Sequence, residues 1–188
     1  TGENSFMRLG QREGADFTTR ASHWRVHYSP AGPGHALFLS SELTENQVVA
    51  YSDNIALARW LQQEIESTFF EIRSTTESPF AADLDIPVID AVFERVGDVR
   101  SYITEEISTA DVDLCLTWYD MIEPMAVHAP PGTRGRSLGV YTIIIPARRA
   151  QLSLDGDFAA GRPLRADREG NEATTACLAW SESWVRAR

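Results

Sequence analysis

Apolar and polar positions alternate with a period of two along much of the chain, which is typical of short, half-buried β-strands. The clearest example is residues 88–107, where two apolar-patterned stretches flank Gly97 and Asp98. Glycine at the first position of a two-residue link favours a type II′ hairpin turn. The register predicted from this turn pairs Val96 with Val99, Phe93 with Tyr102, Val92 with Ile103, Arg95 with Arg100 and Asp90 with Glu105.

The same alternation predicts further strands on both sides of this hairpin. They cover residues 23–29, 35–40, 47–51, 69–73, 111–120, 125–128, 138–146, 150–154, 157–160 and 174–185. Asp155-Gly156 is a second two-residue hairpin signal. Residues 161–172 read as a charged loop, and residues 1–20 as a flexible N-terminal arm without period. Residues 21–188 are expected to form a single antiparallel β domain.

One stretch has a helical period instead. Leu57, Trp60, Leu61 and Ile65 recur at the spacing of an amphipathic helix over residues 54–67, capped by Ser52 or Asp53. About eight to ten short strands with one packed helix predict a mainly β (α+β) protein, either an antiparallel barrel or a β-sandwich. In outline the chain is similar to lipocalin-like and other calycin-type barrels, a resemblance that fixes neither residues nor function.

Composition excludes several chemistries and partners. The net charge of −10 argues against nucleic-acid and anionic-membrane partners, since phosphate contacts need a basic face. All 17 basic residues are arginine, which removes Schiff-base, lysine-base and Walker A chemistry and suggests a GC-rich bacterial source. The sequence has no 18-residue apolar run, so no transmembrane helix is predicted, and no signal peptide is recognisable at the N-terminus. Removal of a leader peptide before this N-terminus is left as an alternative.

The two cysteines, Cys115 and Cys177, lie inside apolar strand-like runs. Free, buried thiols in a cytoplasmic protein are the simplest interpretation, and a single structural disulfide is the alternative. The sequence contains no GxGxxG after a strand, no GxSxG, no HExxH and no CxxC. Nucleotide-binding, serine-hydrolase and zinc-protease activities are therefore disfavoured, and we expect no cofactor.

The last strand carries the most suggestive site. By period two, Leu178, Trp180, Glu182 and Trp184 share one face, which places a carboxylate between two indoles. If that face is interior, desolvation raises the pKa of Glu182 and makes it a usable general acid or base. The alternative is that this face looks outward, or that Glu182 pairs with an arginine.

Other candidate residues are weaker. Tyr119 lies at a strand exit beside Asp120, where either binding or plain turn chemistry fits, and Trp118 points to the opposite face. Arg95 and Arg100, opposite each other in the predicted hairpin, could share a bound carboxylate or phosphate, or be solvated edge charges. His23 and His27 share a face but lie about 13 Å apart, which disfavours a shared metal ion. His27 remains a candidate acid or base acting alone.

These residues support three hypotheses. The first is a barrel with an apolar pocket, lined by Trp24, Trp118, Trp180 and Trp184, that binds a small apolar or aromatic molecule. Cofactor-free acid/base catalysis by Glu182, Tyr119 or His27, of the isomerase, hydratase, cyclase or lyase type, extends it. The second is a non-catalytic module for protein interaction or homodimer formation. The third is a cupin-like metalloenzyme, weakened by the histidine spacing.

Overall fold

The computed structural model describes residues 1–66, 79–133, 138–168 and 170–186, which form a mainly β structure with one short helix. The helix α1 covers Ile55–Leu61, a π-helical turn follows at Gln62–Glu66, and a 3-10 turn covers Glu42–Thr44. The strands are β1 (Gly2–Gly10), β2 (Phe17–Val26), β3 (Gly34–Ser41), β4 (Val48–Ser52), β5 (Val88–Asp90), β6 (Val92–Asp98), β7 (Tyr102–Ser108), β8 (Asp113–Met121), β9 (Met125–Ala129), β10 (Leu138–Leu154), β11 (Asp157–Phe158), β12 (Arg162–Pro163), β13 (Arg165–Arg168), β14 (Asn171–Thr174) and β15 (Ala176–Arg186).

Most strands belong to one curled sheet with the order β5-β4-β3-β2-β1-β15-β10-β8-β7-β6. Neighbours along this path pair antiparallel except β4 and β5, which are parallel. Strands β9 and β11 pair with β10, β12 pairs with β1, and β13 and β14 form a separate hairpin. The predicted mainly β, barrel-type fold is confirmed.

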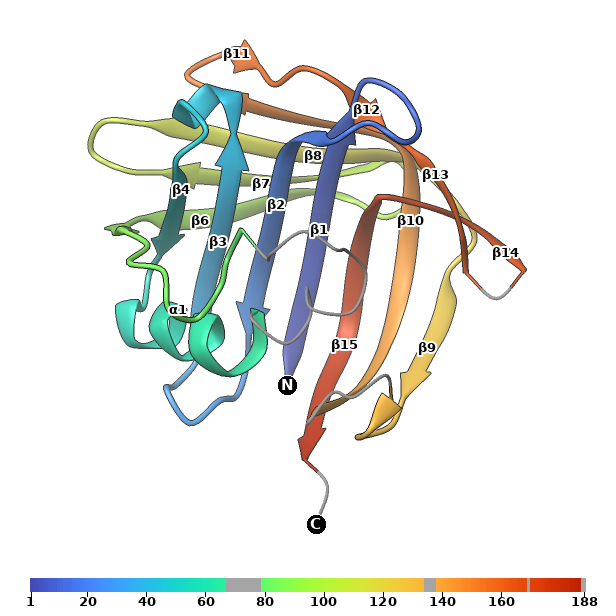
Figure 1. Ribbon diagram of the computed structural model, residues 1–188, viewed down its shortest axis with the longest axis horizontal. Helices are drawn as coiled ribbons and strands as arrows, with labels where there is room; N and C mark the ends of the chain where they lie inside the picture. Colours follow the sequence, from blue (N-terminus) through green and yellow to red (C-terminus); the bar gives the residue numbers. More distant parts are fainter. Residues whose placement is uncertain (67–78, 134–137, 169, 187–188) are drawn as a thin grey trace.

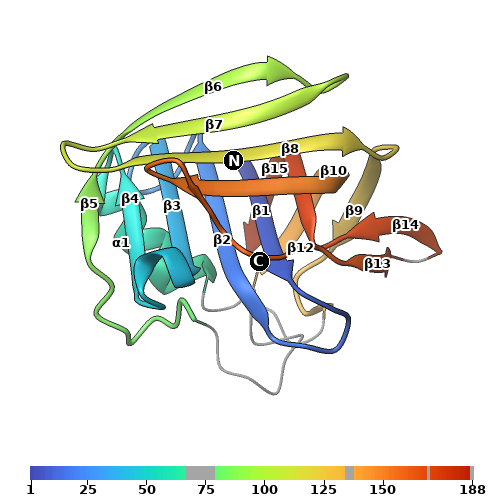
Figure 2. The same ribbon diagram turned by 90° about the horizontal axis from the view of Figure 1, so that it is seen from above.

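The sheet takes its barrel shape from the bend in β10. Residues 138–146 of this strand pair with β15, whereas residues 147–154 pair with β8. Figure 1 shows the result: β1, β2, β3 and β15 lie side by side along roughly one axis, and β6, β7 and β8 cross behind them at a steep angle. At the opposite corner Ala91 alone separates β5 from β6, and its N–H donates to the carbonyl of Ser52 on β4 (3.1 Å). The two ends of the path are therefore held together by the chain itself, as the view from above also shows (Figure 2).

The interior between the two crossed halves is filled by side chains. Alternate residues of β1, β3, β8, β10 and β15 point inward and form the largest apolar cluster, which includes Met7, Leu39, Leu116, Trp118, Leu152 and Leu178. The indole N–H of Trp118 donates to the carbonyl of Phe6 (3.1 Å). This packing differs from the indole-lined hollow that the sequence predicts at this position.

The opposite face of β2, β3 and β4 is covered by the helix. Leu57, Leu61 and Ile65 pack there with Trp24 and Phe38 in a second apolar cluster. The predicted amphipathic face is therefore confirmed, although the cap is Asn54, whose side chain accepts from the backbone N–H of Leu57 (3.1 Å). The predicted helix end at residue 67 and the predicted strand 69–73 lie outside the described residues.

The N-terminal segment is not the irregular arm that the sequence predicts. Residues 2–10 form β1, which pairs with β2 on one side and β15 on the other. Its inward residues, such as Met7 and Leu9, are buried, but its other face carries Asn4, Phe6 and Arg8. By period two the inward face also includes the buried polar residues Glu3 and Ser5, and Phe6 is on the other face, so the sequence of β1 shows no clear apolar alternation. Similarly, β2 begins at Phe17, and residues 162–174 include the short strands β12, β13 and β14 where a loop is predicted.

The central hairpin exists, but its predicted register is wrong. Gly97 lies inside β6 opposite Ile103, with φ +96°, and the turn follows one step later at residues 99–101. The carboxylate of Asp98 accepts from the backbone N–H of Arg100 (2.7 Å), which stabilises this later turn. In the observed register Arg95 pairs with Glu105, not with Arg100. The positive φ of Gly97 therefore marks a distortion of the strand rather than the turn.

Candidate functional site

Strand β15 changes face at a bulge. Its register against β10 shifts between Ile143, opposite Trp180, and Tyr141, opposite Ser183. Ser181 occupies this break with φ +52°, a left-handed conformation that accommodates the extra residue. Leu178 and Trp180 therefore contact the interior cluster, whereas Trp184 contacts the outer one. The prediction that Leu178, Trp180, Glu182 and Trp184 share one face is wrong for this reason.

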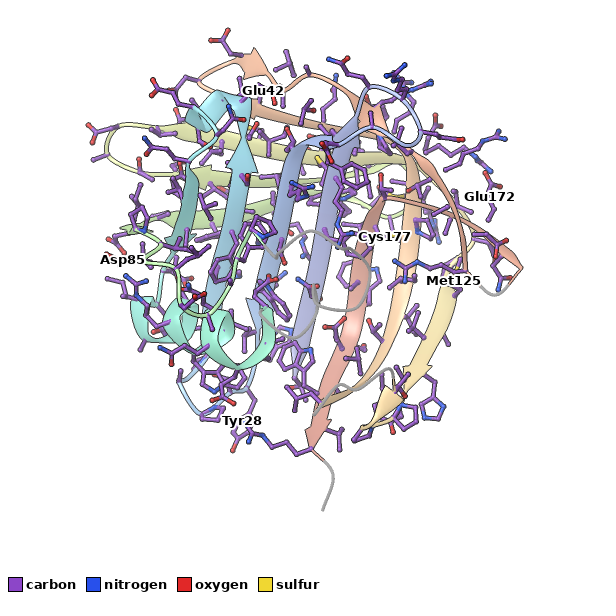
Figure 3. All side chains as sticks on the ribbon, viewed as in Figure 1. Tyr28, Glu42, Asp85, Met125, Glu172 and Cys177 are labelled. Atoms are coloured by element: carbon purple, nitrogen blue, oxygen red, sulfur yellow. The ribbon has the colours of Figure 1, made fainter. Side chains whose placement is uncertain are left out.

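Beyond the bulge, Glu182 lines a pocket of about 150 Å³ on the outer face of the sheet. The walls come from β1, β2, β9, β10, β13, the end of β14 with the following Thr175, β15 at Glu182, and the end of the helical segment at Glu66. Val127, Val140 and Ile144 supply apolar surface. Met125 of β9 and Cys177 of β15, both labelled in Figure 3, belong to a small apolar cluster with Ile144 beside this pocket.

The pocket brings together two buried carboxylates. Glu66 is 1% exposed and Glu182 is 4% exposed, although they come from segments far apart in the sequence. The indole N–H of Trp24 donates to Oε1 of Glu66 (2.5 Å), and the indole N–H of Trp184 donates to Oε1 of Glu182 (2.7 Å). Each carboxylate is thus held by its own tryptophan, so that both are fixed in position at the pocket wall.

Burial dominates the electrostatics of this pair. Desolvation raises the pKa of Glu66 to about 7, against hydrogen bonds from Ser22 and Trp24 that favour the ionised form. Desolvation likewise raises the pKa of Glu182 to about 7, opposed by Trp184 and Thr142, while the charge of Glu66 raises it further. Near neutral pH each carboxyl is therefore present in both protonation states, which suits a general acid or base.

Basic groups lie at another part of the same wall. Arg8 of β1 and Arg168 of β13 both line the pocket. Their guanidinium carbons lie 5.9 Å and 5.7 Å from the ring centroid of Phe6, within the range of cation–π attraction. The positive charge of Arg8 reaches Glu66, whose pKa it lowers slightly against the larger effect of burial. The pocket thus carries both signs of charge around an apolar middle.

Several residues expected at a site lie elsewhere. Tyr119 is on β8, where the guanidinium of Arg149 lies 4.6 Å from its ring centroid. His27 is exposed beside an open groove that it lines with His35 and Asp53. Arg100 is exposed in the β6–β7 turn. None of these residues is among those that line the pocket of Glu182, and they stay separate predictions.

Arg95, Trp118 and Trp180 belong to the interior instead. The Arg95 guanidinium binds Glu105, lies 2.7 Å from Oε2 of Glu3, and stacks 4.9 Å from the ring centroid of Trp180. Burial opposes the charge of Arg95, but Glu105 and Glu3 outweigh it and raise the pKa of the guanidinium. The predicted Arg95–Arg100 anion site is therefore corrected to an internal ion-pair network.

A histidine borders this network. Nδ1 of His23 lies 3.8 Å from Oε1 of Glu105, and its ring stacks with that of His35, with centroids 6.4 Å apart. Burial, followed by the charge of Arg95, lowers the pKa of His23 well below its usual value. His23 is therefore neutral near pH 7, and its approach to Glu105 is not an ion pair.

Among the described residues, no three histidine, cysteine, aspartate or glutamate side chains come together as a metal ion would require. Cys115 and Cys177, both in the described part of the chain, form no disulfide. No described helix is both long enough and apolar enough to cross a membrane.

Sequence reasoning missed Glu66. The spacing is the signal, because Gln62 and Glu66 follow Ala58 at intervals of four, next to Leu57 and Leu61 on the apolar face. The structure shows that all five side chains are buried. Polar side chains in line with the apolar face of a helix point to a buried polar site.

No protein-family model, curated protein or solved structure matches this chain.

Proposed function

We propose that the protein binds a small organic molecule in the pocket lined by Glu66 and Glu182. The observation that carries this proposal is the pair of buried carboxylates, each held by an indole N–H, at the wall of one partly apolar pocket. Binding sites typically combine apolar walls with a few fixed polar groups of this kind. A cavity of about 150 Å³ suits a molecule of roughly benzene size.

The cost of burying the two acids supports the same conclusion. A carboxyl whose pKa rises to about 7 is destabilising to the fold once it ionises, and here two such groups adjoin one cavity. Perturbed carboxyls concentrate at functional sites, because burial gives them a pKa suited to proton transfer. A structural role alone would be served better by apolar or amide side chains at these positions.

A second candidate function is cofactor-independent acid/base catalysis in this pocket. Two carboxyls with pKa values near 7 allow one to accept a proton from the bound molecule while the other returns one. A reaction of the isomerase or lyase type needs this pair of roles. In this chain carboxylates supply them, since lysine is absent.

Benzyl alcohol, a neutral aromatic probe, tests the binding proposal. We expect it to change the tryptophan emission, because Trp24 and Trp184 contact the carboxylates of the pocket. In Val127→Phe the larger side chain enters the pocket from β9 and should abolish binding. The matched control is Ala126→Phe, which places the same ring at the neighbouring exposed position of β9.

Equal binding of benzyl alcohol to wild type and to Val127→Phe would contradict the proposal. Absence of binding, together with concentration-dependent self-association in sedimentation, would favour a non-catalytic interaction module instead.

A further inference from the structure

Arg168 places a buried, unpartnered donor at the pocket. The residue lies at the end of β13 and lines the cavity. Its Nε is buried and has no hydrogen-bond partner among the described residues. A buried N–H without an acceptor is costly, and such a group in a functional pocket commonly awaits a ligand atom.

A second cation reinforces this feature. Arg8 and Arg168 approach the same ring, that of Phe6, so two guanidinium groups gather at one part of the pocket. Both groups are hydrogen-bond donors that suit a carboxylate oxygen, so this part of the wall is the one where an anionic group of a ligand is favoured. This gathering of positive charge is notable in a chain whose net charge is −10.

We propose that the ligand is a small organic monoacid, whose carboxylate accepts a hydrogen bond from Arg168 Nε while its apolar body occupies the space toward Glu66 and Glu182. This inference rests on the binding function proposed above. A single carboxylate fits better than a phosphate, because a dianion would face stronger repulsion from the two glutamates of the same pocket. The apolar part contacts Val127, Val140 and Ile144.

The test compares benzoate with benzyl alcohol, which has nearly the same shape and no charge. Affinities are measured by calorimetry at pH 6 for wild type, Arg168→Gln and Arg165→Gln. Arg165 lies on the same short strand but is exposed and does not line the pocket, so its substitution removes an equal charge nearby. Thermal unfolding of each variant checks that the fold is retained.

Wild type should bind benzoate at least about tenfold more tightly than benzyl alcohol, which corresponds to about 1.4 kcal/mol. Arg168→Gln should reduce this ratio to about one without changing the affinity for benzyl alcohol, and Arg165→Gln should keep the wild-type ratio.

Retention of the preference in Arg168→Gln would overturn the inference, as would an equal loss in both arginine variants. Loss of binding of both benzoate and benzyl alcohol in Arg168→Gln would also overturn it, because Arg168 would then be needed for the shape of the pocket and not for recognition of the carboxylate. If neither probe binds the wild-type protein, the underlying binding function fails instead.

Discussion

Trp24 and Trp184 contact each other, with ring centroids 5.3 Å apart and planes tilted by 58°. They come from β2 and β15, which are separated in the sheet by β1. Each donates its indole N–H to a different carboxylate, Glu66 or Glu182. The aromatic contact therefore links two acids that the sequence places more than a hundred residues apart. The charge of Glu66 also raises the pKa of Glu182, so ionisation of the first carboxyl disfavours ionisation of the second.

Stability should fall as the pH rises from about 4.5 to about 7. The pKa of Glu66 and of Glu182 is near 4.5 when exposed and about 7 in the fold. The contribution of these carboxyls to the free energy of unfolding is fully present below their pKa in the unfolded chain. It is lost as the pH rises through their pKa in the folded protein. Each carboxyl accounts for a loss on the order of 3 kcal/mol. Urea unfolding at pH 5, 6, 7 and 8 measures this slope.

The double variant Glu66→Gln/Glu182→Gln isolates this effect from that of other titrating groups. Its unfolding free energy should vary less with pH than that of wild type, since the amides do not ionise. Glu123→Gln, at an exposed position, should leave the wild-type slope unchanged. Parallel slopes in wild type and the double variant would show that these acids are not responsible.

Substitutions of Arg95 and Glu105, which form an ion pair, should have strongly non-additive effects on the free energy of unfolding. Glu105 is 2% exposed, so Arg95→Met leaves its charge, and that of Glu3, without a partner. Breaking such a pair typically costs about 3–5 kcal/mol. We expect Arg95→Met to be more destabilising than Glu105→Gln, and the double variant to cost much less than the sum of the two. Additive losses in urea unfolding would contradict this coupling.

Gly97→Ala should disrupt the β6–β7 hairpin. A Cβ at this position would lie 2.2 Å from the carbonyl oxygen of Tyr102, and φ is +96°. Gly156→Ala is the matched control, because its φ is +88° but no atom lies within 4 Å of the added Cβ. Gly156→Ala should lower the free energy of unfolding by about 1–2 kcal/mol through backbone strain alone. Gly97→Ala should lower it clearly more, because the added Cβ also clashes with Tyr102. Equal losses would show that the close approach to Tyr102 is relieved cheaply.

The sequence predicts the elements better than their faces. Period-two alternation identifies β3, β8 and β15, and the recurrence of Leu57, Leu61 and Ile65 identifies the helix, since both periods follow directly from burial on one side. The alternation fails where one inserted residue shifts it, as Ser181 does in β15. It fails again in β1, where the polar residues Glu3 and Ser5 are buried on the face that Met7 and Leu9 share. The sequence thus predicts that burial raises the pKa of Glu182, but it does not predict that Glu182 lies in an outer pocket together with Glu66.

The backbone at Ser181 gives a further prediction. Its φ of +52° strains any residue with a Cβ, and its side chain is exposed. Ser181→Gly should leave the unfolding free energy within about 1 kcal/mol of wild type, because relief of strain offsets the greater freedom of the unfolded chain. Ser181→Val should be destabilising by more than about 1 kcal/mol, because a β-branched residue tolerates positive φ poorly. A valine variant as stable as wild type would show that the strand had straightened.

The bulge at Ser181 also decides which surface the end of β15 presents. Ser181 and Glu182 together span the single position opposite Thr142, so the residues beyond them face the reverse of what strict alternation gives. In a regular strand with the same sequence, Glu182 and Trp184 would both point into the packed interior. One extra residue in the backbone thus brings the acid and its hydrogen-bond donor together to the side of the sheet where Glu66 lies.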